Sequence, residues 1–191
     1  MFLLTRPSVR DIDAFVAASQ ALPLSYGRVG MAREPPMPGW TCDAYEAVIG
    51  AGEEAFGRAK RALAAWRHFD LGWTGLFPRS ASIEPGSVVA VLVRHVGFWS
   101  LNGCRVLYGV GAESEFAFAY GTLVNHAECG EEIFAVRFDA VSGNVWYAVR
   151  AVSRPRAPLA RLGYPVVRRL QARFRADSAL AMKRALTEGQ R

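Results

Sequence analysis

The residues best suited to chemistry gather in one stretch of the chain, between positions 120 and 134. The stretch contains hydroxyl, imidazole and carboxyl groups, which belong to Tyr120, Thr122, His126, Glu131 and Glu132. Side chains alternate between the two faces of a strand, so Tyr120 shares a face with Phe118, and Glu132 shares a face with Phe134. The alternation places two ionisable groups among apolar side chains. Burial penalises a carboxylate and raises its proton affinity unless a partner compensates the charge.

Proton transfer is the reaction that these groups could perform. Glu132 or His126 is a candidate general base, and Tyr120 is a candidate general acid. Arg154 is the expected partner of Glu132, because a guanidinium can satisfy a carboxylate through two parallel hydrogen bonds. The alternative is a purely structural network of Glu132, Arg154 and Tyr120 that fixes the hairpin and the corner before the last helix.

Ligand binding is the third interpretation of the same residues, which would form a polar anchor at one end of an apolar cavity. The predicted ligand-binding residues are Tyr120, Thr122, His126, Glu132, Phe134 and Arg154. Covalent catalysis is not expected, because no serine or cysteine lies in a motif typical of an activated nucleophile.

No cofactor or metal is expected from the motifs. The three cysteines, Cys42, Cys104 and Cys129, are too widely spaced for a zinc knuckle or a disulfide framework. His126 and Cys129 have an H-x-x-C spacing, but a metal would need further ligands. The glycine-rich turn at residues 50–52 lacks the third glycine and the lysine of nucleotide-binding loops, and two glutamates follow it.

The elements that must position these groups begin with an N-terminal helix. Ser8 and Asp11 have the spacing of a capping box, and Ile12 and Phe15 continue a helical stripe. Residues 23–39 are rich in proline and glycine, which indicates a connection. We therefore expect an N-terminal helix and connection over residues 1–39 and a second unit over residues 40–191.

The second unit begins with a strand at residues 40–49 and a helix that starts near Glu53. Period-two patterns then predict strands near 69–77, 87–95, 98–101, 104–111, 115–123, 131–139 and 144–152. Turn signals at Asn102-Gly103 and at residues 142–144 favour antiparallel hairpins. A long amphipathic helix is expected from about Pro165 to Leu186.

This order predicts an α+β fold in which a curved antiparallel sheet wraps a long C-terminal helix, with an N-terminal helical extension. The layout resembles the helix-grip fold of START-like and birch-pollen-allergen-like proteins. That resemblance implies a cavity that binds an apolar small molecule, and a minority of those proteins are cyclases or hydrolases. The 11 Phe, 6 Tyr and 5 Trp residues could line such a cavity or could fill it.

A closer resemblance rests on short motifs. They are Tyr120-Gly121-Thr122-Leu123, His126, Gly130-Glu131-Glu132-x-Phe134, Ser153-Arg154-Pro155 and Gln171, with Ile49-Gly50-x-Gly52 upstream. These segments are similar to those of DUF1990, a bacterial and plant family labelled as a domain of unknown function. The resemblance covers roughly residues 40–185. It implies a fold and a shared site region, but no established activity.

Composition limits the remaining classes of function. The chain has 191 residues, of which 51% are hydrophobic and 21% charged, as in an ordinary folded domain. It lacks an apolar run of about 18 residues and a signal-peptide pattern, so we expect a cytoplasmic protein without integral membrane association. The sequence carries no signal for an oligomeric state.

Charge is unevenly distributed. The net charge is +6, yet residues 150–191 alone hold eleven basic and two acidic residues. A basic helix packed on an acidic body explains this pattern, and no nucleic-acid motif is present, so nucleic acid is not an expected partner. The leading hypothesis is binding of an apolar small molecule. The alternatives are an enzyme acting on an apolar substrate and a protein whose basic helix binds an anionic membrane or nucleic-acid surface.

Overall fold

The fold was analysed in a computed structural model, which describes residues 1–35, 37–156 and 163–188. Its helices are α1 (Val9–Ser19), α2 (Glu53–Ala64) and α4 (Tyr164–Glu188), with short 3-10 turns at Met31–Arg33 and Arg67–Phe69. Its strands are β1 (Phe2–Leu3), β2 (Thr41–Ala51), β3 (Thr74–Phe77), β4 (Val88–Arg94), β5 (Trp99–Gly111), β6 (Glu115–Thr122), β7 (Glu128–Phe138) and β8 (Asn144–Pro155).

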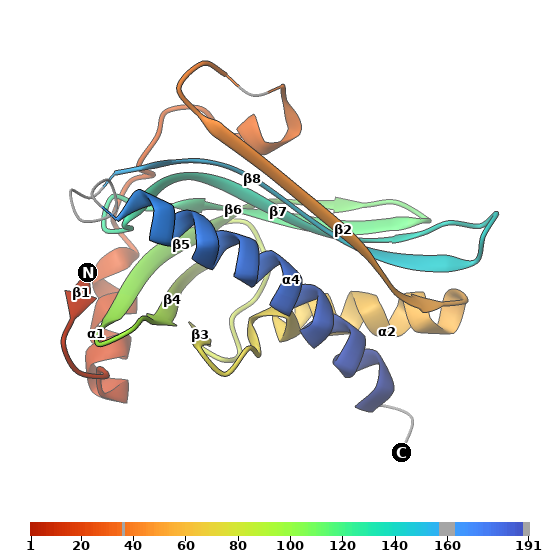
Figure 1. The fold of residues 1–191 in the computed structure, drawn as a ribbon, viewed down its shortest axis with the longest axis horizontal. Coiled ribbons are helices and arrows are strands. Elements are labelled where there is room, and N and C mark those ends of the chain that lie inside the picture. Colours follow the sequence, from red (N-terminus) through yellow and green to blue (C-terminus); the bar gives the residue numbers. More distant parts are fainter. Residues whose placement is uncertain (36, 157–162, 189–191) are drawn as a thin grey trace.

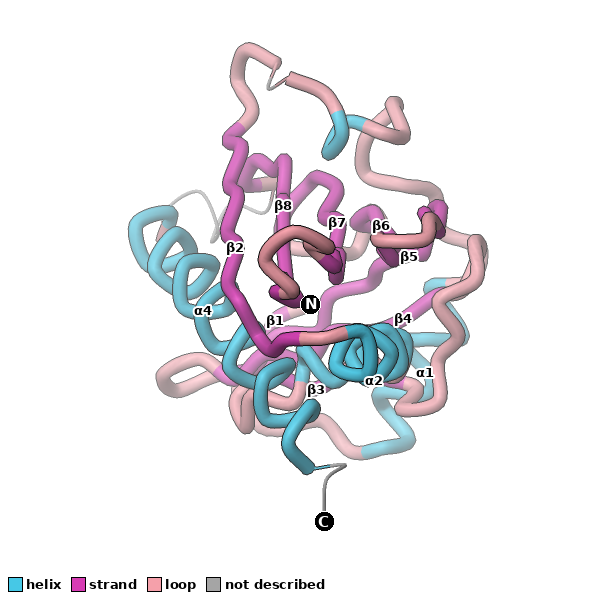
Figure 2. Tube along the Cα trace, turned by 90° about the vertical axis from the view of Figure 1, so that its right-hand side faces the viewer, coloured by secondary structure: helices cyan, strands magenta, loops and turns pink. Residues whose placement is uncertain are grey.

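All strands belong to one antiparallel sheet with the order β2-β8-β7-β6-β5-β4-β3, and β1 pairs with β5. The strands curl into an arc, and α2 and α4 lie in its concave side (Figures 1 and 2). The chain passes from β1 to β2 through α1, crosses from β2 to β3 through α2, and from β3 to β8 pairs each strand with the next along the chain. The expected antiparallel meander and long C-terminal helix are thus confirmed.

Local sequence signals explain the helix boundaries. The Ser8 hydroxyl accepts a hydrogen bond from the backbone N–H of Asp11, and the Asp11 carboxylate accepts one from the backbone N–H of Ser8, which confirms the capping box. In α2 the first turn contains Glu53 and Glu54, where acidic side chains favour the helix dipole. Both helices therefore begin where the capping and dipole signals predict.

Two predicted features of the strands are wrong. Residues 98–101 and 104–111 are not separate strands, because β5 runs without interruption through Asn102 and Gly103. Asn102 donates to the main-chain oxygen of Val91 and to Ser100. A Cβ atom at position 103 would collide with the side chain of Asn125. The Asn102-Gly103 pair therefore lies within a strand, where the glycine leaves room for the Asn125 side chain. The expected strand at 69–77 is shorter, since residues 67–69 form a 3-10 turn.

The main core lies between the concave face of the sheet and the helices α2 and α4. Its centre is aromatic: the Trp66 ring lies 4.7 Å from the Phe118 ring, and Phe69 lies 5.1 Å from Phe174 of α4. Both Trp66 and Phe69 are buried. A second, smaller core forms on the convex face, where Ile12 of α1 packs against β4 and β5.

Residues 1–39 lie against the sheet along much of their length. β1 extends β5, α1 covers the convex side of β4 and β5, and the segment around Met31–Arg33 covers β7 and β8. In Figure 1 the segment around Met31–Arg33 lies above the sheet, on the side opposite to α4. The division of the chain at residue 39 stays a prediction.

Candidate functional site

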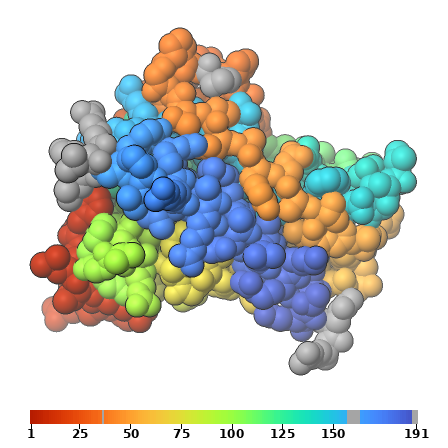
Figure 3. Space-filling view, in the orientation of Figure 1, coloured from red at the N-terminus to blue at the C-terminus, as the bar shows by residue number. Residues whose placement is uncertain are grey.

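A pocket of about 770 Å³ opens between the N-terminal half of α4 and the concave face of the sheet. Its walls come from β1, from β3 to β8 and from α4. Most of the wall is apolar, and the larger contributors are Phe2, Phe69, Trp73, Val91, Leu170 and Phe174. Figure 3 shows α4 (blue) between β2 (orange) and the turn from β4 to β5 (green), which touches the N-terminal segment (red).

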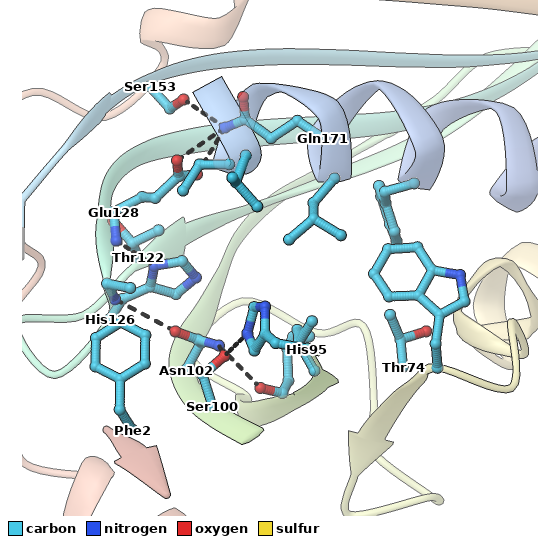
Figure 4. Close-up of a pocket in the computed structure, with 18 of the residues that line it drawn as sticks. Phe2, Thr74, His95, Ser100, Asn102, Thr122, His126, Glu128, Ser153 and Gln171 are labelled. Atoms are coloured by element: carbon cyan, nitrogen blue, oxygen red, sulfur yellow. Dashed lines mark hydrogen bonds between the residues drawn. The ribbon is translucent and has the colours of Figure 1, made fainter. Parts of the chain in front are cut away.

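Polar groups occupy one end of this pocket, as Figure 4 shows. Gln171 extends from α4, Glu128 and His126 come from the start of β7 and the turn before it, and Ser100 and Asn102 come from β5. Thr74 lies at the opposite end. The pocket therefore has a mainly apolar body and a polar end.

Glu132 and Tyr120 form a pair on neighbouring strands, since β6 and β7 place them directly opposite each other. The Tyr120 hydroxyl donates to Oε2 of Glu132 over 2.8 Å. Burial, reinforced by the nearby Glu128 and Asp43 carboxylates, raises the pKa of Glu132 to about 7, although the Tyr120 hydrogen bond and Arg175 oppose that shift. Glu132 can therefore gain or lose a proton near neutral pH.

Glu128 is held by the last helix. The Gln171 amide donates to both oxygens of Glu128, over 2.9 and 2.8 Å, and it also lies 3.4 Å from the Ser153 hydroxyl. Gln171 in turn accepts a hydrogen bond from Arg168 over 2.8 Å. Burial raises the pKa of the Glu128 carboxyl, while the Gln171 hydrogen bond and Arg168 lower it.

Asp43 of β2 binds two arginines of α4. Arg168 donates to both of its oxygens, and Arg175 lies 3.3 Å from Oδ1. The Arg168 hydrogen bond is the largest influence on the Asp43 pKa and lowers it, with a further contribution from Arg175. Two of the arginines that make the C-terminal region basic therefore share one carboxylate of the sheet. Arg161 and Arg191 lie outside the described residues.

His126 is neutral and has a fixed tautomer. Its Nδ1 accepts a hydrogen bond from the backbone N–H of Glu128 over 2.9 Å, so Nε2 carries the proton. Burial, followed by the nearby N-terminal ammonium group, lowers the pKa of His126 to about 3. A ring that does not accept a proton at neutral pH is a poor general base, and the structure favours a role for His126 as a hydrogen-bond donor.

A second polar chain runs along β5. His95 Nε2 and the Ser100 hydroxyl are 2.8 Å apart, Asn102 donates to Ser100, and the oxygen of Asn102 accepts from the backbone N–H of Ala127. These contacts tie the start of β5 to the turn that carries His126. Sequence reasoning missed this chain, because the Asn-Gly pair was interpreted as a turn.

The structure brings four of the six predicted binding residues to the pocket wall, namely Tyr120, Thr122, His126 and Glu132. The Thr122 hydroxyl accepts from the backbone N–H of Gly130 and lies 2.6 Å from the Ser25 hydroxyl. Phe134 is fully buried beneath the wall, with its ring 5.3 Å from that of Tyr120. It supports the pocket without lining it.

Arg154 lies on the other face of the sheet, and the expected pair with Glu132 does not form. The register of β7 and β8 places Arg154 opposite Cys129, whereas Glu132 lies opposite Ala151. Arg154 instead lies 4.5 Å from the centre of the Trp40 ring. The register, which a single sequence does not reveal, keeps Arg154 away from Glu132, and the basic residue that lowers the pKa of Glu132 is Arg175 of α4.

Other residues of the site were not predicted from the sequence. Asp43, Glu128 and Arg175 lie in no motif, and Gln171 was noted only through the family resemblance. Within the described ranges, no group of three His, Cys, Asp or Glu side chains could hold a metal ion. None of the described helices combines the length and apolar character that crossing a membrane requires.

Solved structures with similar folds support the predicted architecture. A protein from Thermus thermophilus matches 79% of this chain and 100% of its own length, with a TM-score of 0.58 and 11% identity. A point mutant of Thalictrum norcoclaurine synthase matches 80% of this chain and 97% of its own length, with a TM-score of 0.52 and 10% identity. At these identities the similarity shows the fold alone. It confirms the predicted α+β helix-grip class.

Sequence relatives assign the family. The family model described as a domain of unknown function, DUF1990, matches residues 25–181. A UPF0548 protein of Dictyostelium discoideum is 31% identical over all of this chain and 98% of its own length. A UPF0548 protein of Deinococcus radiodurans is 35% identical over 97% of this chain and 98% of its own length. On the strength of these matches and the fold, the chain belongs to the DUF1990 family.

Proposed function

We propose that this protein binds an apolar small molecule in the pocket between α4 and the sheet. The observation that carries the proposal is the pocket itself, which combines a volume of about 770 Å³ with a mainly apolar wall and polar groups at one end. Ligand sites typically have volumes of roughly 300–1,000 Å³, apolar walls and a few well-placed polar groups. In this arrangement the body of the ligand contacts Phe69, Leu170 and Phe174, and its polar group lies near Glu132 and His126.

The neighbouring structures add support of a general kind. The norcoclaurine synthase with this fold was solved in complex with a transition-state analogue, so a small molecule binds a protein of the same architecture. The identity of that molecule does not carry over at 10% identity. The polar residues at the pocket end must therefore define the ligand of this protein.

Native mass spectrometry of freshly purified protein, followed by denaturing extraction, tests the proposal. We expect a retained small molecule that disappears in Leu170→Trp, because the indole would occupy the apolar part of the pocket. Leu180→Trp is the matched control, since Leu180 lies on the same helix but is exposed. A fluorescent apolar dye should bind wild type and Leu180→Trp and should fail to bind Leu170→Trp. Equal dye binding to all three proteins, or none to wild type, would overturn the proposal.

A second candidate function is enzymatic. The Tyr120–Glu132 pair supports it, because a carboxyl group with a pKa of about 7 beside a phenol in a pocket can transfer protons at neutral pH. This function predicts that wild type converts the molecule recovered by extraction, and that Glu132→Gln retains the molecule unchanged. Mass spectrometry of the molecule after incubation with each protein separates catalysis from simple binding.

A further inference from the structure

Carboxyl groups outnumber cations in the charged network that includes Glu132. Three carboxyl groups, Glu128, Glu132 and Asp43, influence one another there, and two guanidinium groups, Arg168 and Arg175, compensate them. Both guanidinium groups contact Asp43, which accepts from Arg168 and lies 3.3 Å from Arg175. The network therefore has one negative charge more than its cations balance when all three carboxyl groups are ionised.

Glu132 is the carboxyl group of this network that keeps an unpaired oxygen. Glu128 has both oxygens occupied by the Gln171 amide, and Asp43 has both occupied by Arg168. Glu132 receives one hydrogen bond, from Tyr120 to Oε2, and among the described residues Oε1 has no hydrogen-bond partner. Because Glu132 lines the pocket, a ligand can reach that free oxygen.

We propose that the ligand of this pocket carries a protonated amine on an apolar body, and that the ammonium group binds Oε1 of Glu132. The inference rests on the proposed function and defines its ligand class. An ammonium group supplies both things that the site lacks, a hydrogen-bond donor for the free oxygen and the missing positive charge. A charged pair excluded from water is favourable only when both partners are hydrogen-bonded, and the Tyr120 hydroxyl already supports one side of Glu132.

The same charges select against anionic ligands. A fatty acid or another carboxylate would bring a fourth negative charge next to Glu128 and Glu132. Arg175 lines the pocket, but its guanidinium group contacts Asp43, so neutralising a new carboxylate would require breaking an existing ion pair. Juxtaposed like charges disfavour such a ligand strongly.

The protonation of Glu132 makes the binding of a cation dependent on pH. The groups that act on its pKa are Tyr120 of β6, Glu128 of β7, Arg175 of α4 and Asp43 of β2, and the Glu132 carboxylate in turn raises the pKa of Cys104 on β5 and of Tyr147 on β8. Neutral His126 also lines the pocket, and outside the wall lie the Met1 ammonium, bound to the Leu101 oxygen, and the Arg173–Asp177 ion pair beside Trp73. Because the pKa of Glu132 is about 7, an amine should bind more tightly at pH 8 than at pH 6.

Three probes with the same ring system test the ligand class: naphthylethylamine, naphthylethanol and naphthylacetate. Their dissociation constants are measured by isothermal titration calorimetry at pH 8. We expect the amine to bind about tenfold more tightly than the alcohol and the carboxylate to bind most weakly. In buffers of different ionisation enthalpy at pH 7, amine binding should release protons, and alcohol binding should not.

Glu132→Gln removes the charge and keeps an acceptor for Tyr120. In this variant the amine and the alcohol should bind within about threefold of each other, with the affinity for the alcohol unchanged. Glu84→Gln, which removes an exposed carboxylate elsewhere, should retain the tenfold preference. Glu128→Gln should shift the onset of amine binding to lower pH, because Glu128 raises the pKa of Glu132.

The outcomes separate this inference from the proposed function. If the alcohol binds as tightly as the amine to wild type, or Glu132→Gln weakens all three probes equally, the amine inference is wrong while small-molecule binding stands. If no probe binds wild type and the apolar dye does not bind either, the proposed function fails and the inference fails with it.

Discussion

Glu131 and Glu132 are consecutive residues of β7, but they face opposite sides of the sheet and differ in almost every contact. Glu131 points to the convex side, is 2% exposed and accepts four hydrogen bonds. The donors are the Tyr26 and Tyr108 hydroxyls, at 3.1 and 2.5 Å, and the backbone N–H groups of Gly30 and Ala32, at 2.8 and 3.3 Å. Three of these donors belong to the segment that covers the sheet.

Glu132 points to the concave side, where Tyr120 is its one hydrogen-bond donor among the described residues and a pocket lies beside it. A saturated carboxylate fixes a segment of the chain, whereas a carboxyl group with a free oxygen remains available to a ligand. The comparison teaches that the pocket side leaves one oxygen of Glu132 unpaired, whereas the convex side pairs both oxygens of Glu131. From the sequence alone, the two glutamates differ only in the face of the sheet on which each is expected to lie.

The largest expected effect is on stability, from the same substitution at both positions. Glu131→Gln replaces two acceptor oxygens with one and leaves at least two buried donors without a partner. We expect a loss of about 3–5 kcal/mol in the free energy of unfolding. Glu132→Gln should not lower it at pH 7, because the amide oxygen still accepts from Tyr120 and the substitution removes a buried, partly ionised carboxylate. Urea denaturation of both variants measures the difference, and a larger loss in Glu132→Gln would reverse our assignment of the two roles.

The second largest expected effect is on the pH dependence of stability, which should differ between wild type and Glu132→Gln. The folded protein holds the Glu132 proton up to about pH 7, whereas an unfolded chain loses it above about pH 4.3. Between these values the unfolded state binds fewer protons, so this group lowers stability as the pH rises. The contribution is at most about 4 kcal/mol.

Urea denaturation of wild type and Glu132→Gln from about pH 4.5 to 8 isolates this effect. The stability of Glu132→Gln relative to wild type should rise across the interval. His68 and His126 act in the opposite direction in both proteins, because burial lowers the pKa of each ring to about 3 and stability is lost as the pH falls below about 6.5. Parallel curves for the two proteins would show that Glu132 titrates normally.

The sequence predicts the features that depend on residues close together in the chain, and it fails for contacts between residues far apart in the chain. The capping box at Ser8, the acidic first turn of α2 and the strand alternation at Tyr120 and Glu132 depend on neighbours in the sequence, and the structure agrees with each. The helix-grip layout follows from the order of such elements. Four of the six predicted binding residues line the pocket because alternation alone decides which face they occupy.

The failures concern contacts between distant segments. The partner of Glu132 depends on the register between β7 and β8 and on the rotation of α4, and neither is visible in one sequence. Gly103 follows an asparagine, as in a hairpin turn, but the glycine is needed because Asn125 packs against that position. The four-donor site of Glu131 likewise requires residues 26–32 to return to the sheet, which no local pattern reveals.

The convex side offers a test of intermediate size. Gly121 lies opposite Glu131, and a Cβ atom at this position would collide with the Tyr26 hydroxyl. Gly121→Ala should therefore cost about 2 kcal/mol in wild type. In a Tyr26→Phe background, which lacks that oxygen, the same substitution should cost less than about 1 kcal/mol. Urea denaturation of wild type, the two single variants and the double variant measures both costs. An equal cost in both backgrounds would show that the Tyr26 hydroxyl is not the group with which the added methyl group collides.

The smallest expected effect compares the two tyrosines that serve the two glutamates. Tyr120 donates to the ionised form of Glu132 and thereby lowers its pKa, so Tyr120→Phe should raise the midpoint of that titration by about one pH unit. Tyr108→Phe removes the corresponding donor of Glu131 and should leave the titration of Glu132 unchanged, while it lowers the free energy of unfolding by about 1–2 kcal/mol. Carbon-13 NMR of labelled glutamate side chains measures the titration of Glu132 in each of the two variants. A shift of the Glu132 midpoint in Tyr108→Phe would mean that the two faces are coupled through the sheet, and the contrast between a structural carboxylate and a ligand-binding one would no longer hold.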